Sequence, residues 1–178
     1  MGKDPYPHQA NGIPFCKDSW NDLCKHNCSG FTVLQSIGID LKQAKSNNAS
    51  PVELFNNMAS LGIFFLNLSY EFIGKPIRKH KHFHLLKHAY DINSNFIHQD
   101  CPVILCGEAL KLIWLTTQQS TNWHNAIHPD TRNTKTQQRL EQWRQWWTPN
   151  AIIDKFGLTC PSTPPSFAGL GPHSLRLC

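Results

Sequence analysis

Hydrophobic positions recur along the chain in two patterns, helical spacing and short continuous apolar runs. Ser50-Pro51-Val52-Glu53 has the start signal of a helix, because Ser caps it, Pro takes the first position and Glu completes a capping box, and Gly62 marks its end. Helical spacing predicts further helices over Phe31–Leu41, from Ile77 through His88, over Glu108–Leu115 and over Lys135–Trp147. Three short apolar runs between the helices are typical of buried parallel strands: Ile63–Asn67, Cys101–Gly107 and Trp123–Ile127.

The alternation of helices and strands predicts the fold class. It indicates an α/β fold, a three-layer α/β/α arrangement around a small, mostly parallel central sheet. We expect one domain over residues 1–159 and a poorly ordered Pro/Ser/Gly-rich tail over residues 160–178. Lys17–Gly30 has no clear period, and we expect a loop there, with one helical turn as an alternative; Lys42–Asn48 is expected to be a polar connector.

Three polar or turn residues come at, or directly after, the ends of predicted strands. They are Asn67, Gly107 and His128. In open α/β sheets, ligands bind outside the carboxyl ends of the strands. We therefore expect these three residues to lie at one edge of the sheet, which makes that edge a candidate site.

The first fifteen residues are a second candidate for a site. Three prolines and two glycines between Gly2 and Phe15 exclude a regular helix or a central strand. The stiff loop carries one carboxylate, Asp4, and two aromatic rings, Tyr6 and Phe15, which suits a pocket for a planar ligand. A Pro-rich arm without any chemistry is the alternative interpretation.

The charge balance favours an anionic partner. Lysine and arginine outnumber aspartate and glutamate by 17 to 12, a net charge of +5, and a basic surface fits nucleic acid. Arg78 and Lys79 begin a segment rich in lysine and histidine, for which a phosphate-facing helix and a solvated surface both stay open. We reject a metal site on the alternating histidines, because a helix would scatter them around its axis.

Composition also bounds the environment of the protein. No apolar run reaches about eighteen residues, so we expect no membrane span. The N-terminus has no charged-then-apolar signal pattern, and we expect a cytoplasmic protein. Seven cysteines are an odd number and fit reduced thiols better than disulfides. We expect no metal, since no standard zinc spacing is matched by Cys16, Cys24, His26 and Cys28.

Four short motifs resemble those of the uracil-DNA glycosylase superfamily, nearest the uracil-DNA glycosylases themselves. They come in the family's order and extend over about residues 2–147. The motifs are Gly2–Tyr6 with Ala10–Phe15, then Leu61–Asn67, Val103–Gly107 and Ile127–Pro129.

This resemblance implies a role for each matching side chain. Asp4 would position the attacking water and stabilise positive charge on the sugar, and His128 would hydrogen-bond O2 of the departing base. Phe15 would stack on the flipped base, Tyr6 would crowd its C5 position, and Asn67 would bind its pairing edge. The resemblance also implies DNA as partner and requires no metal or other cofactor, and we expect a monomer.

Several positions depart from the family's pattern. The strand before the first motif is absent, so the fold begins differently, or the sheet needs residues further upstream or a second chain to complete it. The loop between Tyr6 and Ala10 is short, and Arg132 stands near the usual wedge leucine, where it would fill the vacated stack or touch phosphate. We assign DNA contacts to Lys3, Arg78, Lys79 and Arg132.

The leading hypothesis is a monofunctional DNA glycosylase that removes an altered pyrimidine and leaves an abasic site. Tyr6, Phe15 and Asn67 favour uracil and a role in DNA repair. The shortened turn at Pro7-His8-Gln9 favours a modified cytosine, or another hypermodified phage pyrimidine, and a role in antiviral defence. A catalytically silent DNA-binding relative is the alternative from a different class.

Overall fold

The computed structural model describes residues 1–5, 10–25, 27–98, 100–116, 122–130 and 134–157. Within them, no helix is both long and apolar enough to cross a membrane. The α-helices are α1 (Trp20–Leu23), α2 (Ser29–Ser36), α3 (Leu41–Asn47), α4 (Pro51–Ser60), α5 (Lys79–Asn93), α6 (Gln137–Trp147) and α7 (Ala151–Phe156). The remaining elements are the 3₁₀ helices η1 (Ser94–Phe96) and η2 (Gly107–Leu115) and the strands β1 (Val103–Cys106) and β2 (Trp123–Ala126).

The sheet is parallel, and the start of the chain lies inside it. β1 and β2 pair in parallel, from Val103 opposite Trp123 to Cys106 opposite Ala126. On the other side of β1, the amino group of Met1 donates to the carbonyl of Ile104 (2.6 Å), and the Cys106 N–H donates to the carbonyl of Met1 (3.0 Å).

Gly2 extends this pairing to a fourth segment. Its N–H donates to the carbonyl of Leu66 (2.7 Å), its carbonyl accepts from Leu68 (2.9 Å), and it forms a parallel bridge with Asn67. The order across the sheet is therefore Leu66–Leu68, Met1–Gly2, β1 and β2. No regular strand forms in the described part of the opening loop, but Gly2 still bridges to Asn67, since Gly offers an N–H and a carbonyl like any other residue.

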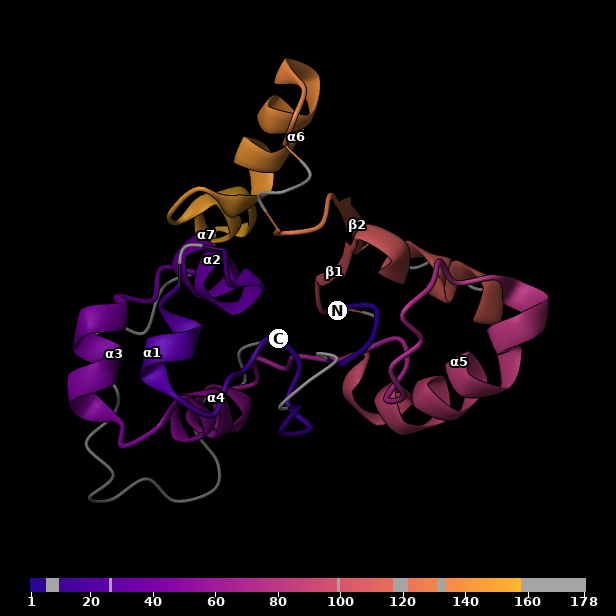
Figure 1. The fold of residues 1–178 in the computed structure, drawn as a ribbon, viewed down its shortest axis with the longest axis horizontal. Helices are drawn as coiled ribbons and strands as arrows, with labels where there is room; N and C mark the ends of the chain where they lie inside the picture. Colours follow the sequence, from indigo (N-terminus) through magenta and orange to yellow (C-terminus); the bar gives the residue numbers. More distant parts are fainter. Residues whose placement is uncertain (6–9, 26, 99, 117–121, 131–133, 158–178) are drawn as a thin grey trace.

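Apolar side chains pack on both faces of this sheet, as the alternation of strand side chains requires. Cys106 and Ala126 belong to a core shared with α1–α4, α6 and α7, whereas the neighbouring Leu105 belongs to a core shared with α5 and η2. Figure 1 shows α1–α4 and α5 on opposite sides of the strands. The predicted α/β fold class is confirmed.

The start signal of α4 and the positions of the strands β1 and β2 are confirmed. Ser50 Oγ accepts from the N–H of Glu53 (3.2 Å), and the Glu53 carboxylate accepts from the N–H of Ala49 (2.6 Å). Gly62 ends the helix with a φ of +86°. β1 and β2 lie inside their predicted ranges.

Other predicted elements are wrong, each for a local reason. Asp40 caps α3 where a polar connector is expected, because a helix that buries only Leu41 and Ala44 shows little apolar period. Of the predicted Ile63–Asn67 strand, only Leu66 and Asn67 pair, and the pairing continues to Leu68; Phe64 is 43% exposed. In α5, Phe83 lies at helical spacing from the buried Leu86 but is itself exposed.

Leu105 provides a test of the core on the α5 side. It is fully buried, so Leu105→Ala should lower the free energy of unfolding by about 2–5 kcal/mol through lost transfer energy and a residual cavity. Leu110→Ala is the matched control, because Leu110 is 43% exposed and should change stability by less than about 0.5 kcal/mol. Urea denaturation measures both, and equal losses would contradict this core.

Candidate functional site

The backbone of Phe15 is held in a strained conformation. Its φ is +65°, in the left-handed region that a bulky residue rarely adopts. It is the third residue of a turn with Pro14 second, closed by the Cys16 N–H donating to the carbonyl of Ile13 (3.2 Å). Gly30 of α2 lies against this turn, and a Cβ there would overlap the carbonyl oxygen of Phe15. Strain of this kind persists where packing fixes it and marks functional segments.

Gly2 allows Asn67 and Phe15 to approach each other. A Cβ on Gly2 would lie 2.8 Å from Asn67 Oδ1 and 3.1 Å from Phe15 Cζ, closer than side chains pack. Asn67 is buried, and its backbone carbonyl accepts from Asn93 Nδ2 (2.7 Å) at the end of α5. Asn93 Oδ1 accepts in turn from the hydroxyl of Tyr70 (2.7 Å), and burial raises the pKa of that hydroxyl above its usual value. These bonds fix the segment that presents the Asn67 amide.

The carboxylate of Asp4 is oriented through one oxygen. Asp4 Oδ2 accepts from the N–H groups of Ile73 (3.0 Å) and Gly74 (3.3 Å) and lies 3.4 Å from Lys3 Nζ. Among the described residues, every hydrogen bond and ion pair of this side chain goes to Oδ2. Oδ1 is therefore the atom that can act on a ligand.

The proton of neutral His128 can be assigned from its surroundings. The N–H of Asp130 donates to His128 Nδ1 (3.1 Å), so Nδ1 has no proton and Nε2 carries it in the neutral ring. The ring packs against Gly107 at the end of β1, where a Cβ would lie 3.2 Å from His128 Cβ. His128 is thus an oriented donor through Nε2.

Two tryptophans of α6 hold the backbone on either side of His128. Trp147 Nε1 donates to the carbonyl of Ile127 (2.8 Å), and Trp143 Nε1 donates to the carbonyl of Pro129 (3.0 Å). Their spacing along α6 predicts core residues, and Trp147 is buried. Their second role, as donors to the histidine loop, is not visible in the sequence.

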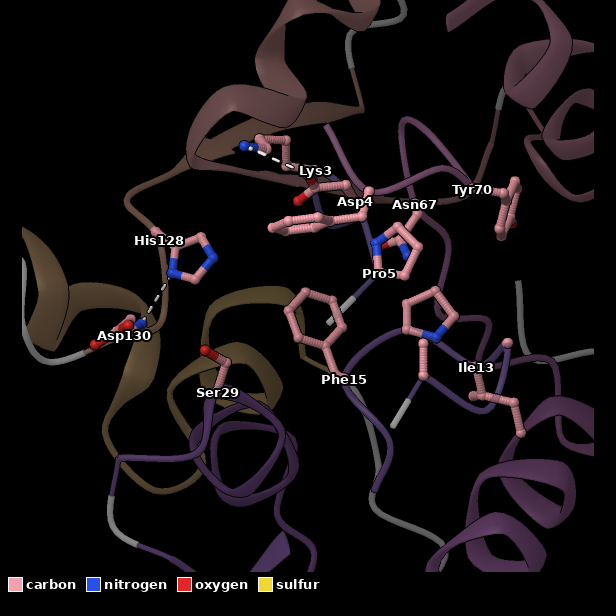
Figure 2. A pocket seen from close by; sticks show the side chains of 15 residues that line it. Lys3, Asp4, Pro5, Ile13, Phe15, Ser29, Asn67, Tyr70, His128 and Asp130 are labelled. Carbon is pink, nitrogen blue, oxygen red and sulfur yellow. Dashed lines mark hydrogen bonds and ion pairs between the residues drawn. The ribbon is translucent and has the colours of Figure 1, made fainter. Parts of the chain in front are cut away.

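The side chains of Asp4, Phe15, Asn67 and His128 line a single pocket of about 440 Å³. Figure 2 shows His128, Asp4 and Phe15 around the same hollow, with Asn67 beside them. A second cleft of about 620 Å³ adjoins it on the far side of Asp4 and His128. Gly107, Glu108, Arg139 and Gln142 line that second cleft. A carboxylate, an imidazole donor, an amide and a ring in one pocket suit a planar, hydrogen-bonding ligand with charge developing beside it.

The pocket brings together four of the five residues predicted to act on the base: Asp4, Phe15, Asn67 and His128, from four separate segments. The predicted convergence of strand ends at one edge is confirmed, with Gly107 against His128. Tyr6 and Arg132 lie outside the described residues.

The predicted DNA-contacting residues have different surroundings. The Lys3 side chain is only 20% exposed, with Nζ near the carboxylates of Asp4 (3.4 Å) and Glu108 (3.9 Å) and bonded to the carbonyl of Lys75 (3.1 Å). Its charge therefore acts inside the site. Arg78 and Lys79 are exposed at the start of α5 and do not line the pocket.

Several residues of the site are not predicted from the sequence. Asp130, a buried carboxylate, and Ser29, at the start of α2, also line the pocket. The sequence offers one signal for Asp130, its place directly after His128-Pro129. Ser29 and Asn93 give no signal, because only tertiary contacts bring them near Asn67 and Phe15.

The cysteines near this site are thiols. Cys16 and Cys28 are buried, and burial raises the pKa of Cys16 above its usual value. Among the described residues, no group of three or more His, Cys, Asp or Glu side chains is arranged to hold a metal ion. His26 lies outside the described residues.

Comparisons of the chain with models of known protein families, with curated proteins and with solved structures found no match. What this pocket does has to follow from its own residues and their contacts.

Trp147→Phe tests the support of the histidine loop. The variant keeps most of the buried ring but leaves the Ile127 carbonyl without its indole donor, which should lower the free energy of unfolding by roughly 1–3 kcal/mol. Trp114→Phe is the control, because Trp114 is 37% exposed and should lose little. Thermal or urea unfolding measures both, and equal losses of stability in the two variants would show that this hydrogen bond does not stabilise the loop.

Proposed function

We propose that the protein is a monofunctional DNA glycosylase that flips an altered pyrimidine out of the helix and hydrolyses its N-glycosidic bond. The observation that carries this proposal is the meeting of Asp4, Phe15, Asn67 and His128 in one pocket. Their motifs resemble those of the uracil-DNA glycosylase superfamily and come in its order. The pocket supports this resemblance with geometry that does not depend on it.

Recognition of the base falls to the buried side of the pocket. The Phe15 ring is a flat apolar surface on which a base extruded from the stack can lie. The Asn67 amide has both a donor and an acceptor, which is what the pairing edge of a pyrimidine requires. Gly2 keeps the amide and the ring close together, so one planar base can meet both.

Catalysis follows from two opposite charges that develop as the bond breaks. Cleavage leaves positive charge on the sugar and negative charge on the departing base. His128 Nε2–H is an oriented donor for the base anion, and the Asp4 carboxylate stabilises the sugar cation. Fixing both groups beforehand means that little reorganisation is needed during the reaction.

Water completes the reaction. A water positioned by Asp4 adds to C1′ of the sugar, its hydroxyl takes the place of the base, and its proton neutralises the base anion. The products are an abasic site and the free base. The step balances with water alone, so no cofactor is required.

Uracil and a modified cytosine both fit the described part of the pocket. A volume of about 440 Å³ lies within the range of pockets that take drug-sized ligands, so the space does not select the smallest base. The wall that would face C5 of the base falls to Tyr6 and the turn after it, outside the described residues. The role in repair or in defence follows from the base that is excised.

His128→Ala should slow base release by about 10²–10³-fold, the scale of one preorganised donor lost from a transition state. His98→Ala is the matched control, because His98 is exposed and lies outside the pocket. Single-turnover release from labelled DNA, followed by alkaline cleavage at the abasic site, measures both rates. A His128→Ala rate within about threefold of the parent would remove His128 from the mechanism.

The substrate panel for this assay contains duplexes with uracil, 5-hydroxymethylcytosine or glucosylated 5-hydroxymethylcytosine. Strand breaks with uracil alone assign a repair-type specificity, and breaks with a modified cytosine alone assign the defence role. Binding to DNA with no breaks in any duplex would contradict the enzyme and favour the catalytically silent DNA-binding alternative.

A further inference from the structure

Positive charge is concentrated in one segment of the chain, Phe72–Tyr90. It contains five of the 17 lysine and arginine residues, and neither aspartate nor glutamate occurs in it. Four of the ten histidines also lie here. The net charge of this segment is therefore +5, equal to the net charge of the whole chain.

α5 displays most of this charge to solvent. The helix buries one narrow stripe, His82, Leu86, Ala89 and Asn93, at spacings of four, three and four residues. Phe83 is 43% exposed beside the basic residues. The exposed basic side chains of the helix are Lys79, His80, Lys81, His84, Lys87 and His88.

Helix stability does not explain this arrangement. Positive side chains are unfavourable near the start of a helix, where the macrodipole is itself positive. The first turn of α5 has no acidic residue, and the side chain of its cap residue, Arg78, makes no capping bond. The ring of His82 accepts the Arg78 N–H at Nδ1 (3.0 Å), and the nearest carboxylate, from Glu108, accepts the Ile77 N–H before the helix begins (3.1 Å). Natural sequences break such local rules chiefly where function requires it.

The basic segment is attached to the pocket at its beginning. Phe72 lines the pocket, and the Gly74 N–H donates to Asp4 Oδ2. Four steps along the chain lead from Gly74 to Arg78, at most about 14 Å of extended chain. The fifteen residues of α5 then span about 22 Å, while duplex DNA carries one charge per about 1.7 Å of its axis. A duplex with one nucleotide in the pocket therefore passes within reach of this helix.

We propose that the exposed face of α5 is a second contact with duplex DNA, which binds the sugar-phosphate backbone beside the flipped nucleotide. This inference rests on the proposed function, which supplies DNA as the partner. Lys81 neutralises one phosphate, Lys87 exchanges its exposed ion pair with Asp91 (3.3 Å) for a second phosphate, and Phe83 packs against the sugars between them. Because such contacts read no base edges, binding through this face is independent of sequence.

The test compares two double variants that lose the same charge. Lys81→Gln/Lys87→Gln removes two lysines from α5, and Lys42→Gln/Lys45→Gln removes two exposed lysines from α3. Fluorescence anisotropy with a short duplex of ordinary bases, from about 50 to 200 mM salt, gives the affinity and its salt dependence. The α5 variant should flatten the slope of log K against log salt by about 1.8, or 0.9 per phosphate, and the α3 variant should leave it unchanged.

Equal slopes for the two variants, or no duplex binding by the parent protein, would overturn the inference. So would equally tight binding of duplex RNA or of anionic lipid vesicles that depends on the same two lysines. Because the probe contains no excisable base, these outcomes do not depend on catalysis. Single-turnover base release by the parent protein tests the proposed function separately, and the Lys42→Gln/Lys45→Gln variant should match the parent there.

Discussion

The backbone hydrogen bonds of Met1 and Gly2 are the constraint on which the rest of the structure depends. They join the segment Leu66–Leu68 to β1, and the sheet formed in this way lies between the two cores. The same residues fix where Asp4 emerges, two positions later. Because Gly2 has no side chain, the Asn67 amide and the Phe15 ring can both lie against it.

The site is rigid because its supports are polar as well as apolar. Two indole N–H groups hold the carbonyls on either side of His128, two backbone N–H groups orient Asp4, and Asn93 holds the carbonyl of Asn67. Each bond satisfies a polar group that would be costly to bury alone. The same contacts that stabilise the fold therefore also orient the groups that would act on a base.

Stability and binding place opposite demands on α5. Its buried stripe anchors Asn93, and through it the Asn67 segment, so the helix supports the pocket from within. Its exposed face concentrates like charges that would be more stable apart. A phosphate backbone lying against this face would relieve that repulsion, which joins the second DNA contact to the element that holds the base-reading amide.

The sequence by itself determined what local chemistry dictates. The capping box of α4, the parallel strands β1 and β2, and the candidates Asp4, Phe15, Asn67 and His128 all follow from short stretches of residues. Tertiary structure decided what depends on residues far apart in the chain. Examples are the pairing of Gly2 with Asn67, the indole donors to the His128 loop and the pairing of Lys3 with Asp4. The physical reason is that hydrogen bonds and ion pairs between distant segments leave no local pattern in the sequence, whereas helix caps and apolar spacing do.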